Sequence, residues 1–488
     1  MIKILIINNK HCQLICDDQE FTNKLKYHLS FRLLGVEYTQ AFQNGWSGRT
    51  FLLSAKNKFN LGLLQTVKDF FEKNEKEFIV EDMRNKKTIE DPIDLTDKLK
   101  LYKFDTRDYQ QRIVDITDKY DRGIVRAATG SGKTLVTALI TAKINKPTII
   151  YVIGLDLLKQ FHDLYSKLFD EKIGYIGNGV CDIQRINIAS IWTIGRSLNV
   201  DAKKICEDEE FENDEKEASY DQKQKIVNLL EKTKLHILDE SHVISCGTMS
   251  EIYKVINPEY FYGFSGTPFK DDGSDLLVHS FLGSKIVDVS ASELIEKKIL
   301  AQPIIKFVPI PKIRLSSSNY QSVYKEYVVE NENRNGIIID NIKKLLDKKY
   351  TPLVLFKQIK HGKILFDLLK DNNINCEMLN GSDSLIRRGE VKSKIENKEI
   401  NLILASTIYD IGLDLPILDA LVLCGSGKSS IRTLQRIGRV IRKFDGKNQA
   451  AIVDFYDQVK FFKQHSCFRK KTYESEKGFR VLKCKDMK

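Results

Sequence analysis

The sequence predicts an α/β protein with two consecutive doubly wound parallel sheets behind a small α+β domain. Short apolar runs bounded by turn residues alternate with amphipathic stretches from about residue 100 to 300, and a second such series follows. Segments of this kind form strand–helix–strand units, whose strands are buried on both faces of a parallel sheet. The length of 488 residues agrees, because it leaves room for about three domains.

The expected borders follow the same pattern. The segment 1–95 has short strands and one helix of its own at 62–74, which predicts a separate accessory domain. The two doubly wound domains are expected over 96–300 and 301–455. The tail 456–488 holds ten Lys or Arg against four acids, interleaved with aromatic residues. This tail either contacts single-stranded nucleic acid or packs its aromatic side chains on the second domain.

Each element of the two sheets has a local reason. Runs rich in β-branched and apolar residues predict strands, and apolar residues at helical spacing predict helices. In the first domain we expect strands at 123–128, 147–154, 186–191, 234–240 and 260–266, and helices at 133–144 and 157–169. In the second domain we expect strands at 351–358, 374–381, 401–407, 419–425 and 450–457, and helices at 363–371 and 433–443.

The segment 127–134 (AATGSGKT) is the strongest local signal, because it follows an apolar run and opens an amphipathic helix. Phosphate loops need this strand, loop and helix context, in which backbone N–H groups and the helix N-terminus face the phosphates. Lys133 would reach the β and γ phosphates, and the Thr134 hydroxyl would hold Mg²⁺. The other residues expected to bind nucleotide here are Ala128, Thr129, Gly130, Ser131 and Gly132. Ala127 replaces the first glycine of the general pattern.

A second glycine-rich segment, 425–429 (GSGKS), also follows an apolar run. The first glycine of a phosphate loop would fall on Val422, inside the expected strand. The loop would then be too short to wrap a triphosphate, so we interpret it as a connection.

The apolar run at 234–238 ends in Asp239 and Glu240. Ligands of open α/β sheets bind at the carboxyl ends of the strands, where these two carboxylates are expected. Asp239 would hold Mg²⁺, and Glu240 would polarise the attacking water. An acidic pair that ends a strand is usually a solvated turn, but this one follows a phosphate loop.

Together, AATGSGKT and Asp239-Glu240-Ser241-His242 resemble the DExH branch of the superfamily 2 helicases, and similar segments follow in family order over 104–455. The resemblance implies two RecA-like motor domains. It assigns the adenine edge to Gln110, within 107–110 (RDYQ), and nucleotide binding to Arg107. Ser265-Gly266-Thr267 resembles the motif that couples hydrolysis to strand movement, with Gly266 in place of Ala. Ser406, Thr407 and 412–414 resemble motif V, which adds Gly412 and Asp414 to the nucleotide site.

The segment 435–442 (QRIGRVIR) resembles motif VI. Guanidinium groups at 436, 439 and 442 recur every three residues, so on a helix they would project from one side. Such an array suits a transferring phosphoryl group at a domain cleft. The resemblance makes Arg439 and Arg442 the arginine fingers and adds Gln435 to the catalytic residues. A basic solvated helix face is the alternative.

Further segments are similar to the phage UvsW-type DNA helicases. They are 353–357 with 361–363, 428–431, and the block 43–49 (QNGWSGR) with Tyr38 before it and 51–53 after it. In that block Trp46 could stack on a base and Arg49 contact phosphate, or Trp46 could fill a small core below a surface Arg49. The resemblance also implies nucleic-acid contacts at Thr193 and Thr407.

Charge and composition limit the class of protein. The net charge of +11 includes a local −7 at 207–217, so the rest of the chain carries +18 and favours a polyanionic partner. The acidic run is expected to be a solvated insertion before Asp239. Nine scattered cysteines without a CxxC pair argue against zinc and for reduced thiols. Neither an export signal nor a membrane span is expected, which indicates a cytoplasmic protein, in the host cytoplasm if it is phage-encoded.

The resemblance implies an ATP-dependent DNA helicase or translocase that uses Mg²⁺. It would unwind DNA, regress forks and migrate junctions in recombination, repair or replication. Its partner would be branched DNA bound without sequence preference, with single-strand-binding or nuclease proteins as candidate partners. An RNA helicase and a restriction-type duplex translocase without its own nuclease remain alternatives. A non-enzymatic nucleic-acid-binding protein would need defective motifs, and none of the catalytic positions is lost.

Overall fold

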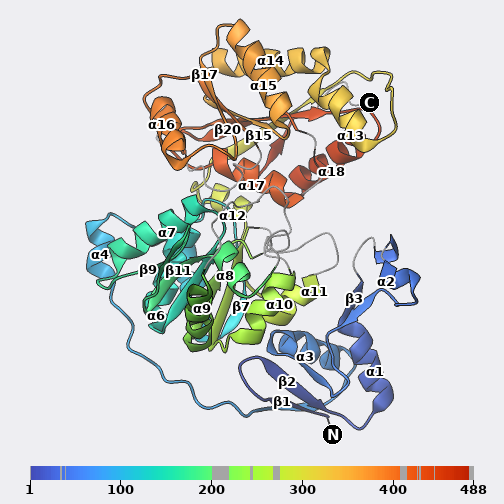
Figure 1. Ribbon diagram of the computed structural model, residues 1–488, viewed down its shortest axis with the longest axis vertical. Coiled ribbons are helices and arrows are strands. Elements are labelled where there is room, and N and C mark those ends of the chain that lie inside the picture. The colour runs from blue at the N-terminus through green and yellow to red at the C-terminus, as the bar shows by residue number, and fades with distance from the viewer. Residues whose placement is uncertain are drawn as a thin grey trace. The chain divides into compact units, whose positions relative to one another are not determined.

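The computed structural model describes residues 2–32, 36–38, 40–200, 219–241, 246–266, 275–406, 415–425, 427, 430–444 and 446–482. The chain divides into two compact units (Figure 1). The first consists of Met1–Ala127 and Gly132–Asp288, and the second of Ala128–Ser131 and Val289–Lys488.

The N-terminal region is built on a four-stranded sheet in the order β5-β2-β1-β6. Alternate residues of β1 are buried, so one face of this sheet packs on helices α1 and α3 around Leu25, Val67 and Phe71. A separate two-stranded antiparallel sheet pairs β3 with β4. The bounds are β1 (Ile2–Ile6), β2 (His11–Ile15), α1 (Gln19–His28), β3 (Ser30–Arg32), α2 (Gln40–Gln43), β4 (Arg49–Phe51), β5 (Lys58–Asn60), α3 (Leu64–Lys73) and β6 (Phe78–Asp82).

The rest of the first unit surrounds an eight-stranded sheet in the order β10-β9-β11-β8-β12-β13-β7-β14. Strands β8, β11 and β12 are buried along their whole length, as expected of a parallel sheet covered on both faces. The strands are β7 (Arg122–Ala127), β8 (Thr148–Val152), β9 (Gly174–Gly177), β10 (Val180–Asp182), β11 (Ile186–Ser190), β12 (Leu235–Leu238), β13 (Tyr260–Ser265) and β14 (Lys285–Val289). The helices are α4 (Thr96–Leu101), α5 (Asp108–Asp115), α6 (Lys133–Ile144), α7 (Leu155–Leu168), α8 (Ile191–Ser197), α9 (Tyr220–Lys232), α10 (Cys246–Val255) and α11 (Asp275–Leu282).

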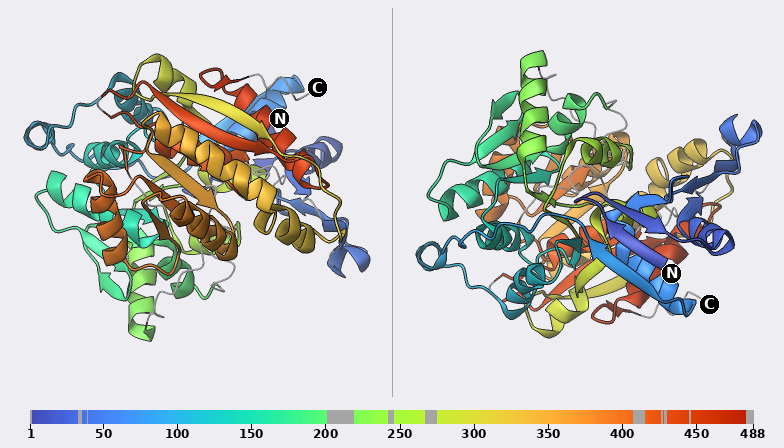
Figure 2. Two further views of the ribbon diagram at one scale, coloured as in Figure 1. Left: turned by 90° about the horizontal axis from the view of Figure 1, so that it is seen from above. Right: turned by 90° about the horizontal axis from the view of Figure 1, so that it is seen from below.

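The second unit contains a seven-stranded sheet in the order β17-β18-β16-β19-β20-β15-β21. Figure 1 shows α14 and α15 on one side of this sheet and α17 and α18 on the other, and the left view of Figure 2 shows the long strands β15 and β20 side by side. The strands are β15 (Gln302–Pro309), β16 (Pro352–Phe356), β17 (Cys376–Leu379), β18 (Leu402–Ser406), β19 (Ala420–Leu423), β20 (Gln449–Tyr456) and β21 (Arg480–Val481). The helices are α12 (Ala291–Glu296), α13 (Tyr320–Val323), α14 (Glu332–Asp347), α15 (Ile359–Asp371), α16 (Leu385–Glu396), α17 (Ser430–Val440) and α18 (Phe462–Ser475).

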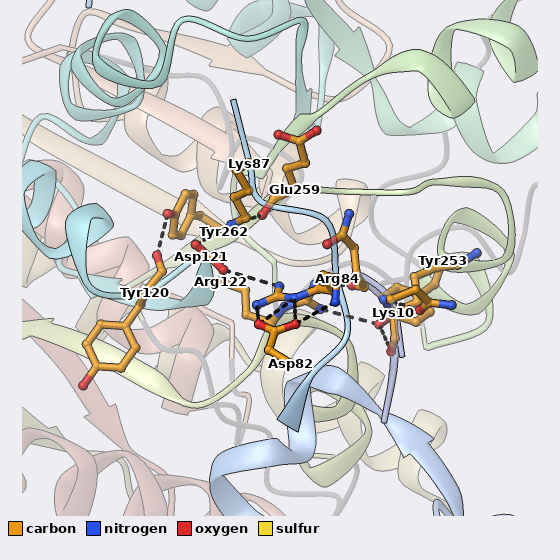
Figure 3. Close-up of polar contacts among 12 residues, drawn as sticks. Lys10, Asp82, Arg84, Lys87, Tyr120, Asp121, Arg122, Tyr253, Glu259 and Tyr262 are labelled. Atoms are coloured by element: carbon orange, nitrogen blue, oxygen red, sulfur yellow. Dashed lines mark hydrogen bonds and ion pairs between the residues drawn. The ribbon is translucent and has the colours of Figure 1, made fainter. Parts of the chain in front are cut away.

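Polar contacts join the N-terminal region to the rest of the first unit (Figure 3). Lys10 Nζ donates to the carbonyl oxygens of Tyr253 at 3.2 Å and Lys254 at 3.0 Å, and the Tyr253 hydroxyl donates to the carbonyl oxygen of Lys10 at 2.8 Å. Arg122, the first residue of β7, donates to the carbonyl oxygen of Asn9. The N-terminal sheet is therefore attached by side chain to backbone bonds at the end of α10 and at the start of β7.

The segment that connects the N-terminal region to α4 is also attached to this unit. Lys87 Nζ donates to the carbonyl oxygen of Glu259 at 3.0 Å and pairs with Asp121. Lys146 Nζ, which is almost fully buried, contacts Thr88 Oγ1 at 2.6 Å and Glu90 Oε1 at 2.9 Å. These contacts give the connection a fixed path along the first unit.

The predicted arrangement of strands and helices is confirmed with one correction. Motif VI was expected on a helix over 433–443, but α17 ends at Val440. Arg442 lies beyond it, where its backbone forms an antiparallel bridge with Leu300, and the Ala301 N–H donates to the carbonyl oxygen of Ile441 at 2.7 Å. Pairing with a distant segment ends the helix here, so the three arginines do not share one helical face.

The tail packs within the second unit, the second of the two arrangements considered. Phe462 and Tyr473 of α18 are fully buried, and β21 pairs with β15 at the edge of the sheet. The remaining domain borders stay predictions. Among the described residues, no helix has the length and apolar character needed to cross a membrane.

Candidate nucleotide and nucleic acid sites

The predicted phosphate loop lies between the end of β7 at Ala127 and the start of α6 at Lys133. Gly130 and Gly132 have φ angles of +84° and +78°, a conformation that favours glycine. A Cβ atom at Gly132 would lie 2.6 Å from Gln110 Nε2, so the loop also needs a glycine there for space. The two glycines allow the sharp turn that exposes backbone N–H groups at the N-terminus of α6.

Gln110 and Arg107 lie at the N-terminus of α5, beside this loop. Gln110 is buried, and its Oε1 accepts a hydrogen bond from the backbone N–H of Arg107 at 3.0 Å. Arg107 Nη1 donates to the hydroxyl of Tyr109 at 3.0 Å. The contact of Gln110 with Gly132 brings the residue expected at the adenine edge next to the loop expected to hold the phosphates.

The acidic pair follows directly on β12. The Asp239 N–H donates to the carbonyl oxygen of Tyr151 at 2.9 Å, so the sheet ladder continues to this residue. Glu240 has a φ of +48°, a left-handed conformation that is uncommon outside glycine. Its carboxylate forms an ion pair with Lys133 Nζ, and both side chains are largely buried. Two motifs separated by about a hundred residues are thus in direct contact.

Asp239 is buried, and within the described part of the chain its Oδ1 atom has no hydrogen-bond partner. Burial raises the pKa of Asp239, an effect that the nearby Lys133 charge opposes. A buried carboxylate oxygen without a donor fits a hard cation, because Mg²⁺ prefers carboxylate and water oxygens. Asp239 therefore fits Mg²⁺, and the hydroxyl of Thr134, the second residue of α6, is an oxygen donor of the same kind.

Arg126, in β7, was not singled out from the sequence. Its Nε donates to the carbonyl oxygen of Gly266 at 3.4 Å, and its guanidinium pairs with Asp288 at 3.3 Å. Ser265 ends β13 and is fully buried. The sequence signal for Arg126 is that it is a charged residue inside the apolar run 123–128. A charged side chain on a strand covered by other elements needs a polar partner.

In the second unit, α17 carries Gln435, Arg436 and Arg439, all partly buried, and Arg442 follows the helix. Ser406 ends β18 and is buried. Val422 lies inside β19, as the interpretation of 425–429 as a connection requires. Several predicted site residues lie outside the described residues: Thr267, Thr407, Gly412 and Asp414, together with the acidic run 207–217.

The predicted nucleic-acid contacts of the N-terminal region lie near the β3–β4 sheet. Trp46 is 40% exposed, so it does not fill a core. The Arg49 guanidinium lies 4.1 Å from the centre of the Tyr27 ring and donates to Ser30 Oγ at 2.9 Å. Elsewhere, Thr193 lies partly buried on α8, and its carbonyl oxygen accepts from Ser197 Oγ at 2.7 Å.

Comparison with known families adds an independent observation. Residues 103–270 match the family described as type III restriction enzyme, res subunit, and residues 333–444 match the helicase conserved C-terminal domain. Residues 1–81 match the N-terminal domain of the DNA helicase UvsW. The chain is a superfamily 2 helicase that resembles UvsW. These domains make it an ATP-dependent, ATP-hydrolysing enzyme.

Two relatives extend over most of this helicase. The ATP-dependent DNA helicase uvsW of Enterobacteria phage T4 is 26% identical over 484 residues, which cover 94% of this chain and 91% of the relative. Putative helicase 22 of Sulfolobus islandicus filamentous virus is 27% identical over 392 residues, or 75% of this chain and 67% of the relative.

Among solved structures, Saccharomyces cerevisiae Dbp5 bound to RNA and ADP BeF3 has a TM-score of 0.56 and 12% identity. The match covers 80% of this chain and 93% of that one. At this identity the likeness supports the fold alone, two RecA-like sheets of the predicted class.

Proposed function

We propose that this helicase acts on DNA, and on branched DNA in particular, by regressing forks, migrating junctions and unwinding strands. Its role would lie in recombination, repair or replication. The observation that carries the motor assignment is the ion pair of Lys133 with Glu240 beside the buried Asp239. The UvsW-type N-terminal match and the DNA helicase relative support the choice of DNA.

In this proposal Lys133 binds the β and γ phosphates of ATP, and Glu240 orients the attacking water. The remaining loop residues, with Arg107 and Gln110, position the nucleotide. Asp239 and Thr134 would hold Mg²⁺, which supplies positive charge against the phosphate oxygens. Arg439 and Arg442, with Gln435, stabilise the charge of the transferring phosphoryl group.

The DNA contacts are proposed on residues of different regions. Trp46 is exposed enough to stack on a base, and Arg49 lies beside it in the chain with its guanidinium on the Tyr27 ring. Thr193 and Thr407 would contact the strand in the motor domains. We also propose an accessory domain up to residue 95 and a border between the motor domains near residue 300. Single-strand-binding or nuclease proteins are proposed partners.

One set of substrates tests this function. Phosphate release and strand separation should be measured with single-stranded, duplex, forked and four-way DNA and with a matched RNA. Branched DNA should give the highest unwinding rate, and RNA should not stimulate hydrolysis. Equal stimulation by RNA would favour an RNA helicase. Hydrolysis on duplex DNA without unwinding would favour a restriction-type translocase, the alternative that the res subunit match supports.

A further inference from the structure

Two arginines are buried inside the second unit, where charged side chains are rarely found. Arg334, on α14, is 1% exposed, and Arg469, on α18, is 4% exposed. Each is paired with an aspartate from the end of β20. Arg334 Nε lies 3.1 Å from Asp457 Oδ1, and Arg469 forms two bonds of 2.8 Å to the carboxylate of Asp454.

Both arginines also donate to the chain between β19 and α17. Arg334 Nη1 donates to the carbonyl oxygen of Cys424 at 3.0 Å, and Arg469 Nη1 donates to the carbonyl oxygen of Gly427 at 2.8 Å. Cys424 directly follows β19, and Gly427 lies three residues before the start of α17. Two guanidinium groups from different helices therefore hold the backbone at two residues that precede the motif VI helix.

This arrangement needs arginine in particular. A planar guanidinium can donate to a carboxylate on one side and to a carbonyl on another, whereas a lysine ammonium is a compact point charge. Burial of an ion pair gives little net stability by itself, because desolvation offsets the attraction. The pairs with aspartate neutralise the buried charge, and the bonds to Cys424 and Gly427 fix the backbone at these two residues.

The tail helix takes part in this network. The Tyr473 hydroxyl donates to Asp454 Oδ2 at 2.8 Å, so two side chains of α18 hold the same carboxylate. Helices α17 and α18 also pack against each other. The tail is thus connected both to the loop before α17 and to α17 itself.

We propose that Arg334 and Arg469 are positioning residues for ATP hydrolysis, which hold the start of α17 and thereby orient Arg439. The inference rests on the proposed role of α17. It gives the C-terminal tail a function within the motor, separate from nucleic-acid binding. Loss of either loop contact should lower turnover more than nucleotide affinity, because α17 would still be present but less well oriented.

The test uses Arg469→Lys and Arg334→Lys in the full chain, assayed with ATP and a single-stranded DNA oligonucleotide. Lysine keeps the charge beside the aspartate but cannot make the same paired contacts. We expect kcat to fall at least tenfold while KM for ATP and the Kd of a non-hydrolysable ATP analogue stay within threefold. Assays at least 15 °C below the melting temperature of each variant separate this effect from a loss of stability.

The matched control is Arg387→Met on α16, which removes an ion pair with Glu377 that is far more exposed. Its kcat should stay within twofold of the wild-type value. Wild-type kcat in both lysine variants would overturn the proposal. Arg439→Ala, measured in parallel, tests the underlying function separately. If Arg439→Ala is impaired and the lysine variants are not, only the positioning role fails, whereas an active Arg439→Ala would contradict the role of α17.

Discussion

Lys133 and Glu240 form an ion pair that joins the start of α6 to the end of β12. In the proposed reaction Lys133 binds phosphate and Glu240 orients water. Each side chain would therefore exchange its present partner in the ion pair for a group of the substrate. A phosphate at Lys133 competes with Glu240 for the same ammonium group. Nucleotide binding and the release of the Glu240 carboxylate are therefore linked.

Replacement of Lys133 should separate hydrolysis from DNA binding. We expect Lys133→Ala to lower ATP turnover at least a hundredfold, because the phosphates lose their charged partner. DNA affinity should stay within threefold. Phosphate release and fluorescence anisotropy measure the two quantities. Lys143→Ala on the same helix, which removes a pair with Asp118, is the control and should hydrolyse ATP normally. Unchanged turnover in Lys133→Ala would contradict the phosphate-loop assignment.

The attachment of the N-terminal region depends on close contact at Gly62. A Cβ atom there would lie 2.3 Å from the carbonyl oxygen of His279 and 2.6 Å from that of Ser280. We expect Gly62→Ala to lower the free energy of unfolding of the first unit by about 1–3 kcal/mol, because backbone must move. Hydrogen exchange near residues 9–11 should also increase.

The control for this change is Gly389→Ala on α16, where a Cβ atom would meet no heavy atom within 4 Å. It should be neutral or slightly stabilising, because alanine favours a helix. Equal melting temperatures and exchange rates for Gly62→Ala and the wild type would show that the two regions are not in this contact.

Trp46 provides a test of the N-terminal DNA contact. If it stacks on a base, Trp46→Ala should weaken binding of forked DNA by about 1–3 kcal/mol, or roughly tenfold to a hundredfold. Fluorescence anisotropy at two salt concentrations measures this loss, and the salt dependence should be unchanged because no charge is removed. Ile89→Ala, which truncates a side chain that is 92% exposed, is the control. Identical affinity of Trp46→Ala and the wild type would remove Trp46 from the DNA site.

Acid should destabilise the first unit through His236. Burial lowers the pKa of this histidine to about 3, whereas an unfolded histidine titrates near 6.5. As the pH falls below about 6.5, the unfolded state gains a proton that the folded state does not, so stability decreases. From pH 6.5 to 5 the contribution is about 2 kcal/mol.

Urea unfolding at pH 7, 6 and 5 measures this effect. The loss of stability should be smaller in His236→Gln than in the wild type, because glutamine does not titrate. Parallel curves for the two proteins would mean that His236 is protonated in the folded state.

Much of the fold could be predicted from local pattern. The helix expected at 133–144 is α6 with the same bounds, and the strands expected around the phosphate loop and the acidic pair are β7 and β12. Apolar periodicity and turn residues are local properties of the chain. These strands and helices can therefore be predicted without knowing which distant residues pack on them. The same local pattern of apolar runs and turn residues indicated the phosphate loop and the two carboxylates.

Distant contacts account for what the pattern did not indicate. The end of α17 at Val440 depends on backbone pairing with residues 300 and 301, and the short strand β21 exists because β15 offers it an edge. In the sequence, nothing distinguishes Arg334 and Arg469 from surface arginines. Only the folded structure shows that they pair with Asp457 and Asp454.

Sequence alone therefore determined most of the strands and helices around the phosphate loop and the acidic pair, indicated the helicase motifs, and showed that the chain is basic outside 207–217. These properties are local or additive along the chain. Only the tertiary structure decided that Lys133 pairs with Glu240, that Asp239 keeps a buried oxygen without a donor among the described residues, and that the basic tail packs into the second unit. Hydrogen bonding and burial depend on residues that are far apart in sequence, so they become known only when the chain is folded.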